Sequence, residues 1–457
     1  MWVAGAWDAI FDGEAVTPKL RSVLLLTGDS LTEKGVEPDT KGWITRLQDE
    51  YRRAADVIPR GLGGYNTRWY LKYAIPTLEK EILSGVYTPT FVTVWFGAND
   101  AALPNGSSYE QHVPREQYKQ NLVKIVNAFK AMAPKAGILL ITPPHVDDAA
   151  RLELSMDLKG DKHGVIDRTN AMAGKYAQAC VETAETMNIP VLDLYTYFNN
   201  MSEWERDELL TDGLHLNLKG NKLMFEQLQN AMSANFSGVV DKLWSWQLPS
   251  YARWVEDDPY SPDDDDDDSS EMFVQQALPK LARDVDLWSE PPALVTLWLG
   301  GNDSALRSGF EAALHVPLAQ YRANLRTIVT ELQQRAPEAA FLLITPPAVN
   351  DQLRLELSGD GELDFSNAGT AAYAQACIEE ARSIGVSALD LHTIMNTLNE
   401  QERQSCQNDG LHLTTKGNAL VADAILETIK REFPALVTRL ETWEHPDYLD
   451  LLAKVDT

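Results

Sequence analysis

The sequence has little cysteine and no long apolar run. Only three of its 457 residues are cysteines, too few for a disulfide framework and at spacings that match no zinc motif. No stretch approaches the roughly 20 apolar residues that span a bilayer. The N-terminal residues lack the basic and then apolar pattern of a secretory signal. These absences predict a cytoplasmic protein without membrane insertion.

Basic residues are also in short supply. Forty Lys and Arg stand against 67 Asp and Glu, which gives a formal net charge of -27. Such a field repels phosphate backbones, so the composition argues against nucleic acid as a partner. The hydrophobic fraction of 44% is typical of globular proteins. The length predicts two or three domains.

The second half of the chain repeats the first. FVTVWFGANDAAL, from Phe91, returns as LVTLWLGGNDSAL from Leu294, and DGLHLNLKGN, from Asp212, returns as DGLHLTTKGN from Asp409. The offset falls from 203 to 197 residues between these matches, because six residues are missing from the second copy. Residues 1–68 have no counterpart. The repeat therefore pairs a complete copy with an incomplete one.

An acidic run separates the two copies. WVEDDPYSPDDDDDDSSE, from Trp254 to Glu271, has too many like charges and too few apolar groups to pack. We interpret it as a disordered, solvated linker rather than a cation site, because a divalent ion needs ligands in a fixed geometry. The sequence thus predicts a complete domain at 1–254, a linker at 255–271 and an incomplete domain at 272–457.

The first copy alternates short apolar runs with longer segments of helical period, which is typical of a parallel α/β sheet. Helices are expected over 43–53, 69–82 and 218–235. The expected strands, in chain order, are SVLLLTG, ADVIPRG, FVTVWFG, GILLITPP and NIPVLDL. Right-handed crossovers place all their carboxyl ends at one edge, where ligands bind in such sheets. We predict a flavodoxin-like three-layer α/β/α fold with strand order 2-1-3-4-5, plus a truncated second α/β copy.

Polar residues and glycines follow these strands and should meet at that edge. Ser30 follows the first strand, Gly64 the second and Asn99 the third, while Asp212 and His215 lie beyond the fifth. A serine, an imidazole that takes its proton and a carboxylate that orients the imidazole can perform nucleophilic acyl transfer. The backbone N–H groups of Ser30 and Gly64 and the amide of Asn99 are candidate donors to an oxyanion. Each feature alone fits a cap or a turn, but their convergence favours a catalytic site.

These residues also carry a resemblance to a known family. TGDSLT, GLGGYNTRW, WFGAND and DGLHLN resemble the four sequence blocks of the SGNH hydrolases, also called GDSL esterases and lipases. The GYNTRW, HVP, QYKQNL and ITPP segments are most similar to the isoamyl acetate-hydrolysing esterase group. The resemblance implies a catalytic triad of Ser30, His215 and Asp212, and an oxyanion hole of Ser30, Gly64 and Asn99. It also implies small acyl esters as substrates, and neither a metal nor an organic cofactor.

The second copy keeps only part of this set. It retains Asn302, Asp409 and His412, but its missing portion would contain the counterparts of Ser30 and Gly64. We therefore expect the second copy to be degenerate and noncatalytic.

Two further points concern the second copy. Ser304 does not replace the nucleophile, because its counterpart in the first copy is Ala101, beyond the oxyanion asparagine. The loss of two strands exposes a sheet edge, so we expect the second copy to pack against the first copy or against another chain. The sequence leaves open whether a segment is missing from it, and whether the copy is regulatory or structural.

The sequence thus favours a serine carboxylester hydrolase that acts on small acyl esters through an acyl-enzyme. Two alternatives stay open. One is deacetylation of a sugar or polysaccharide, or acyl transfer to an alcohol, with the same machinery. The other is a noncatalytic binding or scaffold protein.

Overall fold

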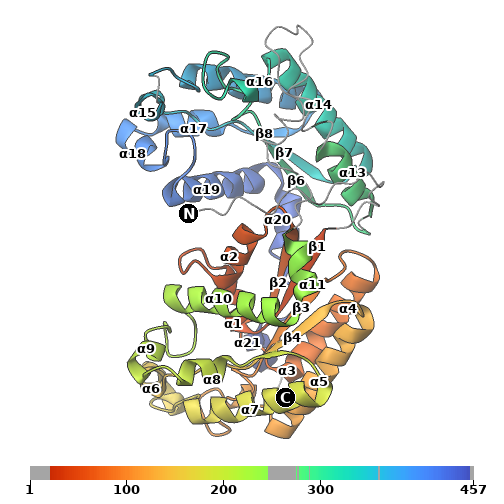
Figure 1. Ribbon diagram of the computed structural model, residues 1–457, viewed down its shortest axis with the longest axis vertical. Helices are drawn as coiled ribbons and strands as arrows, with labels where there is room; N and C mark the ends of the chain where they lie inside the picture. Colours follow the sequence, from red (N-terminus) through yellow and green to blue (C-terminus); the bar gives the residue numbers. More distant parts are fainter. Residues whose placement is uncertain (1–20, 245–273, 275–276, 288, 359–360, 453–457) are drawn as a thin grey trace. The chain divides into compact units, whose positions relative to one another are not determined.

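The computed structural model describes residues 21–244, 274, 277–287, 289–358 and 361–452. The chain divides into two compact units, Met1–Thr67 with Thr88–Gln247 and Arg68–Tyr87 with Leu248–Thr457. The described residues contain a five-stranded and a three-stranded sheet (Figure 1). The predicted linker at 255–271 lies outside the described residues, and the domain boundaries stay predictions.

The first sheet confirms the predicted strand order. Its strands run parallel in the order β2-β1-β3-β4-β5. At the carboxyl edge, Gly28 pairs with Gly61 on one side and Trp95 on the other, so the loops after these strands begin side by side. The strands are β1 (Ser22–Gly28), β2 (Ala55–Gly61), β3 (Phe91–Trp95), β4 (Gly137–Ile141) and β5 (Val191–Leu192).

The helices of the first copy lie between and after these strands. They are α1 (Ser30–Glu33), α2 (Trp43–Glu50), α3 (Thr67–Trp69), α4 (Ile75–Leu83), α5 (Arg115–Met132), α6 (Asp148–Ser155), α7 (Asn170–Met187), α8 (Leu194–Asn199), α9 (Glu203–Asp207), α10 (Leu218–Asn235) and α11 (Ser237–Leu243). The last predicted helix, 218–235, matches α10.

One predicted helix is interrupted. In place of a continuous helix over 69–82, a π-helical turn at Tyr70–Ala74 joins α3 to α4. Pro76 lies in the first turn of α4, and a proline has no N–H to donate and crowds the carbonyl four residues earlier. The turn before it therefore widens rather than continuing as α-helix.

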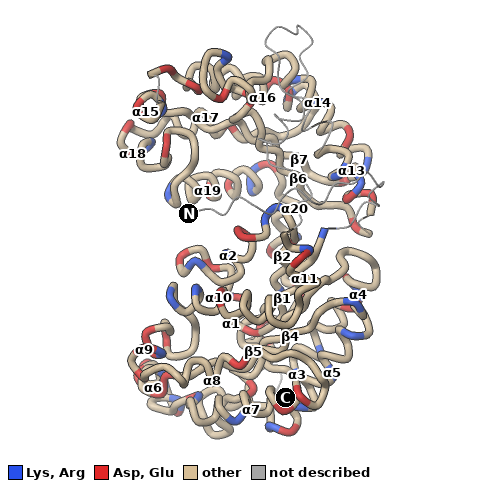
Figure 2. Tube along the Cα trace, viewed as in Figure 1, with Lys and Arg blue, Asp and Glu red and all other residues tan. Residues whose placement is uncertain are grey.

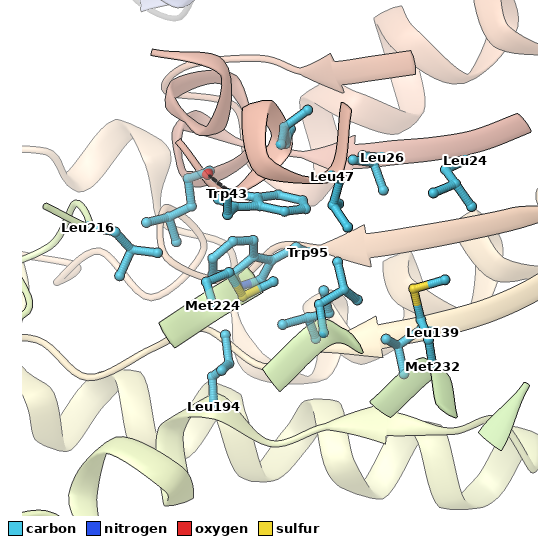
Figure 3. Close-up of a cluster of buried hydrophobic side chains, with 14 of the residues drawn as sticks. Leu24, Leu26, Trp43, Leu47, Trp95, Leu139, Leu194, Leu216, Met224 and Met232 are labelled. Atoms are coloured by element: carbon cyan, nitrogen blue, oxygen red, sulfur yellow. Dashed lines mark hydrogen bonds between the residues drawn. The ribbon is translucent and has the colours of Figure 1, made fainter. Parts of the chain in front are cut away.

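The core of the first sheet is apolar on both faces. Side chains alternate along a strand, so Leu24 and Leu26 of β1 face the layer formed by α2 and α10, where Trp43 and Met224 pack (Figure 3). Leu25, between them, is also fully buried. On the other side α5 and α7 pack together, and α7 contacts β4. Burial on both faces explains why the strands are continuous apolar runs.

Within the first sheet, charged residues occur on the edge strand β2, at Asp56 and Arg60. Strands β1, β3 and β4 carry none, as the tan segments in Figure 2 show. None of the described helices is both long and apolar enough to cross a bilayer.

The second copy forms the smaller sheet, with parallel order β6-β7-β8. Its strands are β6 (Leu294–Trp298), β7 (Ala340–Ile344) and β8 (Ser387–Leu389). Its helices are α13 (Leu278–Leu287), α14 (Leu318–Arg335), α15 (Asp351–Leu357), α16 (Asn367–Ile384), α17 (Leu391–Thr397), α18 (Glu400–Ser405), α19 (Thr415–Glu432), α20 (Pro434–Leu440) and α21 (Tyr448–Leu452). The prediction of a truncated copy that keeps the last three strands is confirmed.

The missing strands leave β6 at an edge of its sheet. In the first copy β3 lies between β1 and β4, and all five of its residues are buried. Within the described residues β6 pairs with β7 alone, and Leu297 is its one buried residue. Trp298 is 41% exposed, whereas its counterpart Trp95 is fully buried. The expectation that another surface covers this edge stays a prediction.

Candidate active site

Three side chains that the sequence predicts to act together lie along a chain of hydrogen bonds. Nε2 of His215 is 2.8 Å from Oγ of Ser30, and Nδ1 of the same ring is 2.7 Å from Oδ2 of Asp212. Ser30 begins α1, and the other two residues lie in the loop before α10. When Nδ1–H donates to the carboxylate, Nε2 can accept the hydroxyl proton. This geometry can convert a weak nucleophile into a strong one.

Ser30 is held by a tight turn from strand to helix. Asp29 caps α1, because its Oδ1 accepts the backbone N–H of Leu31 at 3.0 Å. Gly28 has to be small, since an added Cβ would lie 2.7 Å from the carbonyl oxygen of Trp95. Ser30 is 8% exposed. The turn thus fixes the hydroxyl at the carboxyl edge of the sheet.

A second turn presents the imidazole. Oδ1 of Asp212 accepts the backbone N–H groups of Leu214 and His215, at 3.0 and 2.8 Å. Gly213, which follows Asp212, has a φ of 79°, a value that glycine adopts without strain. Burial acts to raise the pKa of Asp212, but the hydrogen bonds and charge of His215 and the charge of Arg151 outweigh it and hold this pKa well below its usual value. The carboxylate therefore stays ionised beside the ring.

The two further predicted oxyanion donors lie in loops that are tied together. Asn99 follows β3, is 2% exposed, and donates from Nδ2 to the carbonyl of Tyr65 at 2.8 Å. Gly64 precedes that tyrosine and has a φ of 73°. Its carbonyl accepts Nε2–H of Gln111 at 3.0 Å. The loop after β2 is thereby fixed against the loop after β3.

The second copy preserves the acid–imidazole turn, and within its described residues no serine hydroxyl is hydrogen-bonded to the ring. Nδ1 of His412 is 2.7 Å from Oδ2 of Asp409. Burial acts to raise the pKa of Asp409, but the hydrogen bonds of His412 prevail and lower it to about 2. The His412 side chain is 75% exposed, against 19% for His215. The second imidazole thus lies open where the first meets Ser30.

An open cleft of about 470 Å³ borders this second turn. Its lining includes Trp298 and two residues that the second copy retains from the site, Asn302 and His412. In the first copy the counterpart of Trp298 is covered, because Trp43 of α2 packs edge-on against Trp95 with ring centroids 5.8 Å apart. The cleft therefore corresponds to the missing strands and helices.

Ser304 is engaged within the second copy. It is 2% exposed, its hydroxyl donates to the carbonyl of Gly301 at 2.8 Å, and it lies 3.1 Å from the hydroxyl of Thr370. These contacts fit a structural side chain.

Sequence reasoning missed two groups beside the oxyanion residues. Arg168 donates a hydrogen bond to Asn99, and Gln111 donates one to the carbonyl of Gly64. Neither belongs to a sequence block named above. A comparison of the two copies could have indicated both residues, because the second copy has Phe365 in place of Arg168 and Leu314 in place of Gln111. Within the described residues, no group of three or more His, Cys, Asp and Glu side chains is placed to hold a metal ion.

Comparison with known proteins identifies the family. Residues 26–223 and 267–420 each match the model of the GDSL-like lipase/acylhydrolase family. The chain belongs to this family. The double match also confirms the tandem arrangement inferred from the repeat.

Two relatives by sequence agree with this assignment. The chain is 42% identical over 225 residues to a GDSL esterase/lipase of Arabidopsis thaliana, covering 49% of this chain and 90% of that protein. It is 36% identical over 225 residues to the isoamyl acetate-hydrolyzing esterase 1 homolog of Rattus norvegicus, covering 49% of this chain and 86% of that protein. A crystal structure of a lipase/acylhydrolase from Enterococcus faecalis is 25% identical and covers 47% of this chain and 96% of that one, with a TM-score of 0.35. As a member of the family, the protein is a GDSL-type carboxylic ester hydrolase.

Proposed function

We propose that the first copy hydrolyses small acyl esters through an acyl-enzyme formed on Ser30, and that the second copy is noncatalytic. The observation that carries the proposal is the unbroken hydrogen-bonded series from Asp212 through His215 to the Ser30 hydroxyl.

The proposed reaction has two halves. Oγ of Ser30 attacks the ester carbonyl carbon while its proton passes to Nε2 of His215, and Asp212 stabilises the resulting imidazolium. Collapse of the tetrahedral intermediate breaks the bond to the alcohol oxygen, which takes the proton from His215. Water then attacks the acyl carbon while one of its protons passes to Nε2 of His215, and collapse breaks the bond to Oγ of Ser30, which takes that proton. The products are a carboxylic acid and an alcohol.

The proposed oxyanion hole combines three donors. These are the backbone N–H groups of Ser30 and Gly64 and the side-chain amide of Asn99. One N–H of that amide is used by Tyr65, which leaves its other N–H for the substrate oxygen. Donors that are fixed before the reaction stabilise the developing charge without reorganising.

The substrate class rests on similarity. Isoamyl acetate is an alkyl acetate, and the name of the rat relative refers to its hydrolysis. We therefore propose alkyl esters of acetate or another short acid. Equal or faster turnover of acetylated sugars would favour the deacetylase alternative, and transfer of the acyl group to added alcohol would favour the transferase.

The two copies provide a matched experiment with short p-nitrophenyl esters. Ser30→Ala should abolish turnover, whereas His412→Ala should leave it unchanged. Activity retained by Ser30→Ala would refute the nucleophile, and loss of activity in His412→Ala would refute the noncatalytic role of the second copy. Absence of esterase activity at every chain length, with a stable co-purifying protein, would favour the scaffold alternative.

The proposal includes a cytoplasmic location. All three cysteines, Cys180, Cys377 and Cys406, lie in the described residues and are buried as free thiols. Buried reduced cysteines are common where thiols are kept reduced. Fractionation of the source cells tests this, and recovery in the secreted fraction would contradict it.

A further inference from the structure

Arg168 is a buried cation between the two loops that carry the proposed oxyanion donors. It precedes α7 and is 5% exposed. We propose that Arg168, together with Gln111, positions Asn99 and Gly64 for oxyanion binding, an inference that rests on the proposed function. Arg168 is here a positioning residue that acts through these donors.

All three guanidinium nitrogens of Arg168 donate hydrogen bonds. Its Nη2 donates to Oδ1 of Asn99 and to Oε1 of Gln111, both at 2.6 Å. Its Nε donates to the carbonyl of Ala98 at 2.8 Å, and its Nη1 pairs with Asp167. A planar guanidinium with several donors imposes its own geometry on such acceptors. Arg168 thus binds both Ala98 and Asn99.

The contact with Asn99 decides which way its amide points. An asparagine amide has one accepting oxygen and one donating nitrogen. Since Arg168 can only donate, it retains the oxygen on its own side and turns the nitrogen away from itself. A charged donor also strengthens the hydrogen bond it makes and polarises the group that accepts it. Arg168 therefore both orients Nδ2 and makes it a better donor.

Gln111 extends this control to the glycine loop. Its Oε1 accepts from Arg168, while its Nε2 donates to the carbonyl of Gly64. Its backbone carbonyl accepts Nδ2–H of Asn66, at 2.8 Å. Because the side-chain amide bridges the guanidinium and the glycine carbonyl, a displacement of Arg168 reaches both donors.

The second copy shows what replaces this network when no oxyanion hole is needed. Phe365 stands where the first copy has Arg168, and Leu314 stands where it has Gln111. Phe365 is buried with Ala305 and Val349, and Leu314 packs against them. A polar pair has thus been exchanged for an apolar pair at matching positions.

The second copy retains the ion pair next to the position of Arg168. This distinguishes a role in folding the segment from a role in positioning the oxyanion donors. Arg151 donates to Asp167 in the first copy, and Arg354 donates to Asp364 at the matching positions of the second. The backbone contact made by the aspartate carbonyl also recurs, from Leu103 in the first copy and Leu306 in the second. This segment therefore folds without the guanidinium, and what the second copy lacks is its contact with the oxyanion residues.

The test compares full-length variants on p-nitrophenyl acetate. Arg168→Met should lower kcat by about 10- to 100-fold, below the roughly 100- to 1,000-fold cost of losing an oxyanion donor outright, with little change in KM. Arg168→Lys should recover part of kcat, since it keeps a cationic donor. Tyr176→Phe is the control for stability, because it removes a buried hydroxyl that donates to the carbonyl of Val113 and should leave kcat unchanged.

A double-mutant cycle with Asn99→Ala separates positioning from a structural effect. If Arg168 acts through Asn99, Arg168→Met should cost much less in the Asn99→Ala background than in the wild type. Equal costs in both backgrounds, or a kcat for Arg168→Met within about twofold of the wild type, would overturn the proposal.

Gln111→Leu provides a second route if Arg168→Met does not fold. It copies the residue of the second copy, keeps the pairing of Arg168 with Asp167 and should lower kcat by about 3- to 10-fold. An unchanged kcat in Gln111→Leu would overturn the positioning role. The esterase activity of the wild type would in that case still support the proposed function. A wild-type protein without esterase activity would overturn both.

Discussion

The Ser30 hydroxyl lies 2.8 Å from Nε2 of His215, although 185 residues separate them in the sequence. The strand-to-helix turn after β1 places one partner, and the Asp212 turn before α10 places the other. Their meeting gives the first copy its proposed chemistry. The second copy has the imidazole turn and no counterpart of this serine in its sequence, so matched substitutions in the second copy can serve as controls.

Asp212→Asn should lower kcat by about 10³- to 10⁴-fold with a small change in stability. The asparagine oxygen can still accept the backbone N–H groups of Leu214 and His215, but its NH₂ group would favour the wrong imidazole tautomer. Steady-state kinetics and thermal unfolding measure the two effects. The matched control is Asp409→Asn in the second copy, with unchanged kcat. A kcat within tenfold of the wild type would argue against the triad.

Asn99→Ala should lower kcat by about 10²- to 10³-fold, because it removes one oxyanion donor. KM should change little, since the amide acts mainly on the charge that develops in the transition state. Asn302→Ala, the matching change in the second copy, should be kinetically silent. A large rise in KM at constant kcat would instead assign Asn99 to substrate binding.

Asp29→Asn should stabilise the protein in a pH-dependent way. Burial raises the pKa of Asp29 to about 7 from the ordinary value of 3.8. Between these values the folded carboxyl holds a proton that the unfolded one releases. The contribution of Asp29 to the free energy of unfolding is therefore fully present below pH 3.8. It is lost as pH rises toward about 7, by up to about 1.4 kcal/mol per pH unit.

The asparagine has no such titration and keeps the oxygen that caps α1. The variant should therefore gain stability relative to the wild type between about pH 5 and about pH 8. Urea unfolding at the two pH values measures the difference. A stability difference that is the same at both would show that Asp29 is ionised in the folded protein across this range.

Trp43→Ala should destabilise the first copy by about 3 to 5 kcal/mol. The indole is fully buried, packs on Trp95, and donates from Nε1 to the carbonyl of Leu31 at 3.0 Å. Calorimetric unfolding measures the loss. Trp204→Ala serves as the control, because Trp204 is 71% exposed and its removal should cost no more than about 0.5 kcal/mol. Similar losses in both variants would contradict the central place of Trp43 in the core.

Much of the fold could be predicted because its strands are buried on both faces and read as apolar runs. The helix at 218–235 was predicted to the residue, and in the structure the side chain of Asn217 caps its start. The interruption around Tyr70–Ala74 was missed because Pro76 acts on the turn that precedes it. The last strand was predicted too long, as only Val191–Leu192 pair with β4.

The candidate site was predictable where the chain order itself places residues at the sheet edge. Ser30 and Asn99 directly follow paired strands, and Asp212 and His215 share one short turn. Arg168 could not be placed in the same way, because it reaches the edge from a loop before α7. The six residues that the second copy lacks fall in that same loop, so local pattern gives no indication of where its side chains point.

The most direct test of the account is the site of covalent capture by an alkyl fluorophosphonate, mapped by mass spectrometry on the intact, folded protein. One adduct per chain is expected, on Ser30, formed in His412→Ala as in the wild type and absent from Ser30→Ala. An unlabelled Ser30, or an adduct on Ser304 or another residue of the second copy, would contradict it.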